Sequence, residues 1–216
     1  MIQLYNVDCM KALQGMNDDE FDLAIVDPPY GGSKKGSTKI DNIPRASRDK
    51  NVKKYKANWN IAPPEEYFTE LRRVSKNQII WGGNYFSALW DKYCRGFVIW
   101  DKCQISKLHA DCEFAYTSFD CNAKIFKYRS AGAHLGDSLA PPRIHPTQKP
   151  IALYEFLLQR YANKGDRILD THLGSGSIAL ACHNLGFDLV GYEIDSEYYT
   201  AASKRLKDHQ RQLNLF

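Results

Sequence analysis

Short apolar runs recur along the chain, and amphipathic stretches separate them. The runs have the length of buried strands, and they lie at residues 2–4, 23–26, 78–81, 97–100, 167–169 and 189–192. The stretches between them repeat apolar residues at helical spacing, and they lie at residues 63–75, 151–161, 178–185 and from 196 onward. This alternation is typical of an α/β fold, in which helices cover both faces of a mostly parallel, twisted sheet. The pattern therefore predicts three layers.

The length of 216 residues fits one main domain over residues 1–216. Residues 103–143 are less regular and combine short aromatic alternations with a loop that contains glycine, so we expect a small inserted lobe there. No apolar run approaches the roughly 20 residues that a membrane-spanning helix needs. Residues 1–10 lack the basic start and the apolar stretch of a signal peptide, which predicts a cytoplasmic protein with no membrane role.

Positive charge is concentrated in residues 31–58. This segment holds nine basic and two acidic residues, a local charge of +7 in a chain whose net charge is +4. It has few large apolar side chains and scattered Gly, Ser, Asn and Pro, so it is expected to form a mobile loop that suits a nucleic-acid backbone. An exposed loop without a partner is the alternative. The residues expected to contact DNA are Lys34, Lys35, Lys39, Arg45, Arg48, Lys53 and Lys54.

Six cysteines are spread along the chain without the close C-x-x-C pairs of zinc and redox sites. One segment contains several potential metal ligands, which are Cys103, His109, Cys112 and Cys121. Their spacings fit no standard pair of ligands, so we predict reduced thiols and no metal.

The first motif, Asp27-Pro28-Pro29-Tyr30, directly follows the strand-like run 23–26. Ligands of open α/β sheets bind beyond the carboxyl ends of strands, so these side chains should face a cleft. The amino group of a nucleobase is a poor nucleophile because its lone pair is delocalised into the ring. The Asp27 carboxylate and the Pro28 carbonyl could accept hydrogen bonds from its two N–H groups, while Tyr30 stacks on the base. An ordinary proline-rich turn is the alternative.

A glycine-containing bend follows the run 167–169, and its residues are Asp170, Thr171, His172, Leu173, Gly174, Ser175, Gly176 and Ser177. Glycines let a ligand approach the backbone, and Glu193, after the next strand-like run, is placed to accept both hydroxyls of a ribose. The bend therefore predicts an adenosine site. Gly174, Gly176 and Ala179 also satisfy the G-x-G-x-x-A dinucleotide pattern, so a nicotinamide dehydrogenase is a rival interpretation.

The third motif, His145-Pro146-Thr147-Gln148-Lys149-Pro150, leads into the helical stretch that starts at Ile151. A helix N-terminus with a nearby lysine suits a carboxylate, such as the amino-acid end of S-adenosylmethionine. A polar turn with a capping threonine is the alternative.

Together the motifs resemble those of the DNA amino-methyltransferases, the adenine-N6 and cytosine-N4 family, in its beta arrangement. In that arrangement D-P-P-Y comes first, a target-recognition region follows, and H-P-T-x-K-P and the glycine-rich motif come last, as they do here. The resemblance spans nearly the whole chain, which in size is similar to the solitary enzymes of phages and prophages. It implies a Rossmann-like, S-adenosylmethionine-dependent fold in permuted motif order, working in a bacterium or a bacterial host.

The resemblance also assigns roles to residues. Catalytic and base-holding roles go to Asp27, Pro28, Pro29 and Tyr30. Cofactor contacts go to Asp8, near the adenine, to Lys149, near the methionine carboxylate, and to Asp170, His172, Gly174, Ser175, Gly176, Ser177 and Glu193. Residues 79–86 and 97–102 are similar to the segments that build the base pocket. Thr171-His172 departs from the family's usual Pro-Phe, so an imidazole replaces the aromatic ring expected beside the cofactor.

The resemblance favours adenine N6, because cytosine-N4 members more often carry serine where Asp27 stands. The implied substrate is double-stranded DNA with the target base flipped out, held by the loop 31–58 and chosen by residues 103–143. The last residues, Gln212 to Phe216, resemble the peptide by which bacterial DNA-processing proteins bind the sliding clamp. A tail folded onto its own domain is the alternative.

Other functions stay open from the sequence. Methyltransferases of protein glutamine or RNA guanine have similar turns, but they generally place the glycine-rich motif before the turn. A dehydrogenase would explain residues 174–193 and leave residues 27–30 and the basic loop unused. A non-catalytic DNA-binding module would explain the loop and the tail, and binding of S-adenosylmethionine distinguishes it from an enzyme. The sequence does not decide between a monomer and a homodimer, or whether a restriction enzyme accompanies the protein.

Overall fold

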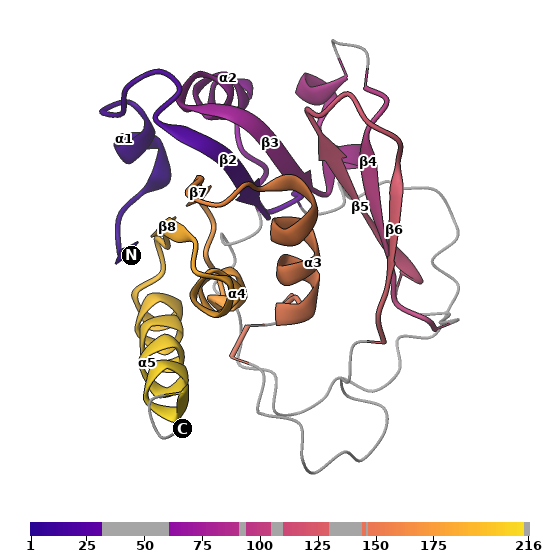
Figure 1. Cartoon of the computed structure of the whole chain (residues 1–216). Helices are drawn as coiled ribbons and strands as arrows, with labels where there is room; N and C mark the ends of the chain where they lie inside the picture. Colours follow the sequence, from indigo (N-terminus) through magenta and orange to yellow (C-terminus); the bar gives the residue numbers. More distant parts are fainter. Residues whose placement is uncertain (32–60, 91–93, 105–109, 130–143, 146, 214–216) are drawn as a thin grey trace, which may run out of the picture.

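The computed structural model describes residues 1–31, 61–90, 94–104, 110–129, 144–145 and 147–213 (Figure 1). The strands are β1 (Ile2–Tyr5), β2 (Phe21–Val26), β3 (Ser75–Trp81), β4 (Phe97–Asp101), β5 (Cys112–Thr117), β6 (Lys124–Lys127), β7 (Arg167–Asp170) and β8 (Asp188–Tyr192). The α-helices are α1 (Cys9–Leu13), α2 (Glu65–Val74), α3 (Ile151–Tyr161), α4 (Ser177–Leu185) and α5 (Ser196–Leu213), and two short 3-10 turns are η1 (Gly83–Tyr85) and η2 (Ser87–Leu89).

The strands of the described residues form one sheet in the order β1-β8-β7-β2-β3-β5-β4-β6. Every pairing is parallel except those of β5, which runs antiparallel to β3 and β4. Parallel neighbours need crossover connections, and α2 supplies the one from β2 to β3 and α4 the one from β7 to β8. The predicted α/β class with a mostly parallel sheet is confirmed.

Helices cover both faces of the sheet (Figure 1). Helices α3, α4 and α5 pack on one face through side chains such as Leu157, Ile178 and Leu206. Helices α1 and α2 pack on the other face, where Leu13 and Leu71 are fully buried. The three predicted layers are therefore present.

Local chemistry explains where two of the helices begin. Helix α2 has glutamates in its first turn and arginines in its last, which complements the helix dipole at both ends. Before α5, Asp195 Oδ1 accepts hydrogen bonds from the backbone N–H groups of Glu197 and Tyr198, at 2.8 and 3.3 Å. Asp195 therefore caps the N-terminus of α5.

Two parts of the fold differ from expectation. Helix α1 was not predicted, because it has five residues and only Leu13 is buried among them. The described part of residues 103–143 does not form a separate lobe: β5 and β6 extend the main sheet, with β5 beside β3 and β6 at the edge. Short aromatic alternations show that strands exist but not which sheet they join.

The described residues include no helix that is both long and apolar enough to cross a membrane.

A matched pair of truncations tests the position of the core. Ile25, near the carboxyl end of the inner strand β2, is fully buried, whereas Ile125 on the edge strand β6 is 63% exposed. We expect Ile25→Ala to lower the free energy of unfolding by about 2–5 kcal/mol, because it leaves a cavity. Ile125→Ala should cost less than about 1 kcal/mol. Urea unfolding followed by circular dichroism measures both, and equal losses would contradict the layer assignment.

Candidate active site

The carboxyl ends of β2, β7 and β8 meet at one edge of the sheet, where a cleft of about 940 Å³ opens. Nine of the residues predicted to act in catalysis or cofactor binding line it, and these are Asp27, Pro28, Pro29, Tyr30, Lys149, His172, Gly174, Ser175 and Glu193. They come from three motifs that are far apart in the sequence. The structure thus joins the predicted catalytic turn and the predicted adenosine site in a single cavity.

Both carboxylate oxygens of Asp27 accept a hydrogen bond. The Tyr30 hydroxyl donates to Oδ1 at 2.8 Å, and the Lys149 ammonium donates to Oδ2 at 2.5 Å. Burial, and then the negative charge of Asp27, raises the pKa of Tyr30, so its hydroxyl remains a donor. A carboxylate oxygen can accept two hydrogen bonds, so each oxygen keeps room for an N–H group of a substrate.

The ring of Tyr30 is held by the turn that follows β3. Gly82 has a positive φ of 67°, and a Cβ there would lie 2.1 Å from Tyr30 Cε1, so only glycine lets the two segments approach this closely. Tyr85 stacks on Tyr30 with ring centroids 4.9 Å apart and an interplanar angle of 15°. Tyr85 also lines the cleft and is 61% exposed. A planar ring therefore already stacks on Tyr30.

Lys149 lies in a cluster of alternating charges. Besides Asp27, its ammonium pairs with Glu113 Oε2 at 3.2 Å, and Lys102 pairs with the other Glu113 oxygen at 2.7 Å. The Lys149 side chain is almost fully buried and lies over the Trp81 ring. Burial lowers the pKa of Lys149, but Asp27 and Glu113 outweigh it and the net shift is upward. The structure pairs Lys149 with Asp27, and its contact with the methionine carboxylate stays a prediction.

The glycine-containing bend is shaped to receive a ligand. Glu193 Oε2 accepts from Gly174 N at 2.8 Å and Oε1 accepts from Asp195 N at 2.9 Å, which fixes the carboxylate at the rim of the cleft. Gly176 has a φ of 71°, and a Cβ there would lie 3.0 Å from Ala202 of α5. Arg205 of α5 donates to the Ser175 carbonyl at 2.9 Å. The last helix therefore supports the bend from behind.

Asp170 lies beneath this bend and is 2% exposed. Its Oδ1 accepts a hydrogen bond from His172 N at 2.9 Å. Burial raises the pKa of Asp170 to about 8, despite that hydrogen bond. The carboxyl is therefore largely neutral at neutral pH and ready to become charged when a cation binds beside it.

His172 occupies the wall of the cleft as a neutral imidazole. Burial lowers the pKa of His172 to about 4. Its Nδ1 lies 2.9 Å from Thr171 Oγ1, which in turn lies 2.6 Å from the hydroxyl of the buried Tyr67. At the departure from the family pattern, Thr171 and His172 therefore form a partly buried hydrogen-bonded chain with Tyr67.

Some predicted residues lie elsewhere. Asp170, Gly176 and Ser177 sit beneath the cleft and do not line it. Asp8 is the N-cap of α1, with Oδ1 accepting from Met10 N at 2.9 Å, although its charge acts on His172, which does line the cleft. Its contact with an adenine stays a prediction.

Other predictions fall outside the described residues. The basic residues predicted to contact DNA all lie within 32–60, and the end of the predicted clamp-binding tail lies within 214–216. Within the described part of the chain no group of three or more His, Cys, Asp or Glu side chains is arranged to hold a metal ion.

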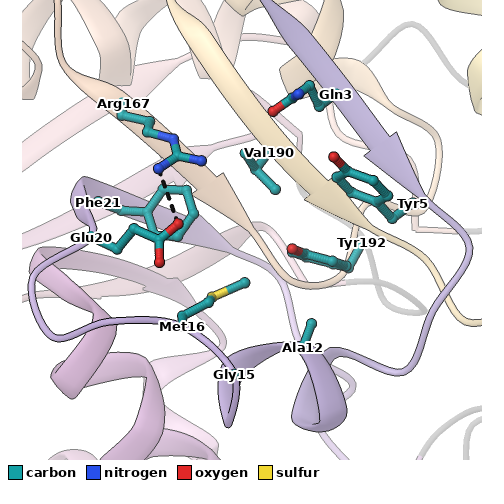
Figure 2. A pocket seen from close by; sticks show the side chains of 10 residues that line it. All are labelled: Gln3, Tyr5, Ala12, Gly15, Met16, Glu20, Phe21, Arg167, Val190 and Tyr192. Atoms are coloured by element: carbon teal, nitrogen blue, oxygen red, sulfur yellow. Dashed lines mark hydrogen bonds and ion pairs between the residues drawn. The ribbon is translucent and has the colours of Figure 1, made fainter.

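A second, smaller groove of about 320 Å³ opens on the face covered by α1 (Figure 2). Tyr5 and Tyr192 stack there with centroids 5.5 Å apart, and Arg167 pairs with Glu20 at 3.0 Å (Figure 2). Its lining shares no residue with the main cleft or with the predicted site.

Comparison with known proteins agrees with this geometry. A model of the N6/N4 DNA methylase family matches residues 82–204, which is more than half of the chain. The chain belongs to this DNA methylase family. This confirms the family that the motifs resemble, and it decides against a nicotinamide dehydrogenase and a non-catalytic module.

Individual relatives support the assignment of the chain to the DNA methylase family. The chain is 27% identical to the type II methyltransferase M.HpaI of Haemophilus parainfluenzae, over 91% of this chain and 71% of the relative. It is 24% identical to the putative methylase YubD of Escherichia coli K12, over 94% and 89% of the two chains.

Solved structures share the fold. M1.HpyAVI in complex with S-adenosylmethionine matches with a TM-score of 0.61 and 24% identity, over 95% of this chain and 100% of that chain. The cytosine-N4-specific PvuII DNA methyltransferase matches with a TM-score of 0.62 and 13% identity, over 99% and 93% of the two chains. The Rossmann-like methyltransferase fold is therefore confirmed.

Several cleft residues were missed by sequence reasoning. Glu113 and Tyr154 line the cleft, but they come from β5 and α3 and belong to no recognised motif. Tyr85 lies in a segment expected near the base, although nothing in its spacing predicts its stacking on Tyr30. The residues around Glu113 are expected to choose the target, which stays a prediction, and the structure pairs this carboxylate with Lys149.

Proposed function

We propose that this DNA methyltransferase transfers a methyl group from S-adenosylmethionine to the N6 amino group of a flipped-out adenine. The observation that carries the proposal is the single cleft onto which the Asp27 turn and the Gly174 bend both open. Asp27, where cytosine-N4 relatives more often have serine, favours adenine. Cytosine N4 is the alternative, and the PvuII enzyme of the same fold has that specificity.

S-adenosylmethionine is the methyl donor, and the chemistry of the cleft fits it. Each Glu193 oxygen carries one backbone hydrogen bond and retains capacity to accept a ribose hydroxyl. The buried Asp170 provides a carboxyl that a nearby cation would ionise. A Cβ at Gly174 would fill space next to His145, so the glycine keeps the backbone open to a ligand. Lys149 lines the cleft and pairs with Asp27, and its contact with the methionine carboxylate stays a prediction.

The residues of the chain then act mainly by positioning. When bound, the donor supplies an electrophilic methyl group on a sulfonium that leaves as a neutral thioether. Asp27 and the Pro28 carbonyl accept hydrogen bonds from the two N–H groups of the target amine. These bonds direct the nitrogen lone pair toward the methyl group. Tyr30 stacks on the base, in a position where it now stacks on Tyr85. Asp27 finally takes up the proton that the methylated nitrogen loses.

The DNA must be deformed for this reaction, because a base inside a duplex does not reach such a cleft. We propose that the basic segment 31–58 binds the backbone, since it leaves the catalytic turn directly after Tyr30. Residues 103–143 are proposed to choose the target, because β5 brings Glu113 to the cleft wall. The clamp-binding tail stays a prediction from the sequence, and the choice between a monomer and a homodimer stays open.

The target atom can be identified directly. The protein is incubated with methyl-labelled S-adenosylmethionine and genomic DNA from a strain without DNA methylation, and the DNA is digested to nucleosides for chromatography. We expect label in N6-methyldeoxyadenosine. Label in N4-methyldeoxycytidine would select the alternative, and no label in DNA would contradict both.

Replacement of Asp27 should stop transfer but not donor binding. We expect Asp27→Ala to lower the single-turnover rate by at least about 100-fold, because an acceptor of the reacting amine is lost. The Kd for S-adenosylmethionine should change by less than about 3-fold, since Glu193 and the glycine bend remain. Asp18→Ala, which removes a largely exposed aspartate near the opposite end of β2, is the control and should keep the full rate. A parallel loss of rate and donor affinity would contradict the role of Asp27.

Donor binding should depend on pH through Asp170. The pKa of this carboxyl is raised to about 8, so it is mostly neutral at pH 6. A cation bound beside it favours the ionised form, and binding then releases a proton. We therefore expect the Kd for S-adenosylmethionine to fall as pH rises from 6 to 8, by up to about tenfold per unit. Calorimetry measures this, and Asp170→Asn should flatten the profile. An unchanged slope in that variant would contradict the assignment.

A further inference from the structure

Glu113 is a charged residue of the cleft for which the proposed reaction has no role. It belongs to β5, far in the sequence from the three motifs, and its side chain is 24% exposed. Burial alone would raise its pKa, but the Lys149 and Lys102 ammonium groups bring the pKa below its ordinary value. Glu113 is therefore a carboxylate held ionised inside the active site.

The contacts of Glu113 connect it to the reacting centre through one side chain. Lys149 bridges Glu113 Oε2 and Asp27 Oδ2, at 3.2 and 2.5 Å. Two carboxylates therefore share one almost fully buried ammonium, and Lys102 balances the remaining charge. With Glu113 in place the four groups sum to zero charge, and without it they carry one surplus positive charge.

The surplus positive charge would lie beside Asp27, where the proposed reaction also develops positive charge. During methyl transfer the positive charge moves from the sulfonium sulfur to the target nitrogen, which the proposed mechanism places against Asp27. Without Glu113, the Lys149 ammonium would also interact more strongly with the Asp27 carboxylate. Both effects oppose the transition state more than the bound ground state.

We propose that Glu113 is a positioning residue for methyl transfer, which shares the Lys149 ammonium with Asp27 and so keeps the Asp27 carboxylate available to the target amine. The proposal rests on the function proposed above. It assigns Lys149 to the base side of the cleft, and it gives the segment expected to choose the target a direct connection to catalysis.

The test compares two glutamates of similar burial. Glu113→Gln keeps the shape of the side chain and removes its charge. Glu20→Gln makes the same change at an ion-paired glutamate whose side chain is 23% exposed and which lines the second groove. With labelled donor and unmethylated genomic DNA, we expect the single-turnover rate of Glu113→Gln to fall by about 10- to 100-fold, and that of Glu20→Gln to stay within about 2-fold. The donor Kd of Glu113→Gln should change by less than about 3-fold.

A double-mutant cycle shows whether Glu113 acts through Lys149. In a Lys149→Met background the further change Glu113→Gln should alter the rate by less than about 2-fold, because the shared ammonium is already gone. Glu113→Asp should restore part of the rate. Thermal unfolding of each variant separates these effects from loss of the fold.

Each outcome distinguishes the two proposals. A fully active Glu113→Gln variant, or additive effects of the two substitutions, would overturn the role of Glu113 and leave the proposed function intact. An equal loss of rate and donor affinity would make Glu113 a donor-binding residue instead. Wild-type protein that binds the donor but labels no DNA would count against both.

Discussion

The parallel pairing of β2 with β7 and of β7 with β8 is the constraint on which the active site depends. Leu23 pairs with Ile168, and Asp170 pairs with Gly191, so the three strands end at the same edge of the sheet. Asp27 follows the end of β2, Glu193 follows the end of β8, and Asp170 is the last residue of β7. Because the register fixes the relative heights of the strands, the sites proposed for the substrate amine and for the donor open onto one cleft. The permuted order of motifs does not matter to this geometry.

Around that cleft, buried charged groups are compensated by ion pairs and not by contact with solvent. Lys149 is buried with two carboxylate partners, while Asp170 has no comparable ion pair among the described contacts and is largely neutral at neutral pH. Buried ion pairs are costly unless their geometry is good, and they are retained where they serve orientation. The arrangement gives one carboxylate that is paired with a buried ammonium, Asp27, and one that is largely neutral until a cation arrives, Asp170.

The sequence predicts most of the fold, because buried strands and amphipathic helices leave strong periodic patterns. The three motifs also predict which residues face the cleft, since each follows a strand or opens a helix. Helix α1 is too short to show a period, and the sheet partners of β5 depend on long-range packing. The pairing of Lys149 with Glu113 joins residues from two distant segments, and no local pattern encodes it. Resemblance places a residue in the site, but its contacts depend on neighbours that the motif does not contain.

Helix α5 ties the end of the chain to the cofactor bend. Arg205 holds the Ser175 carbonyl and the Ser177 hydroxyl, and Ala202 packs against Gly176. The bend has little rigidity of its own because glycines occupy two of its positions. A chain shortened before Arg205 would keep every residue proposed to act in catalysis or donor binding. It would lose the part of α5 that supports the bend. In engineering this enzyme, fused partners therefore belong after the complete helix, and minimal versions of the domain have to retain it.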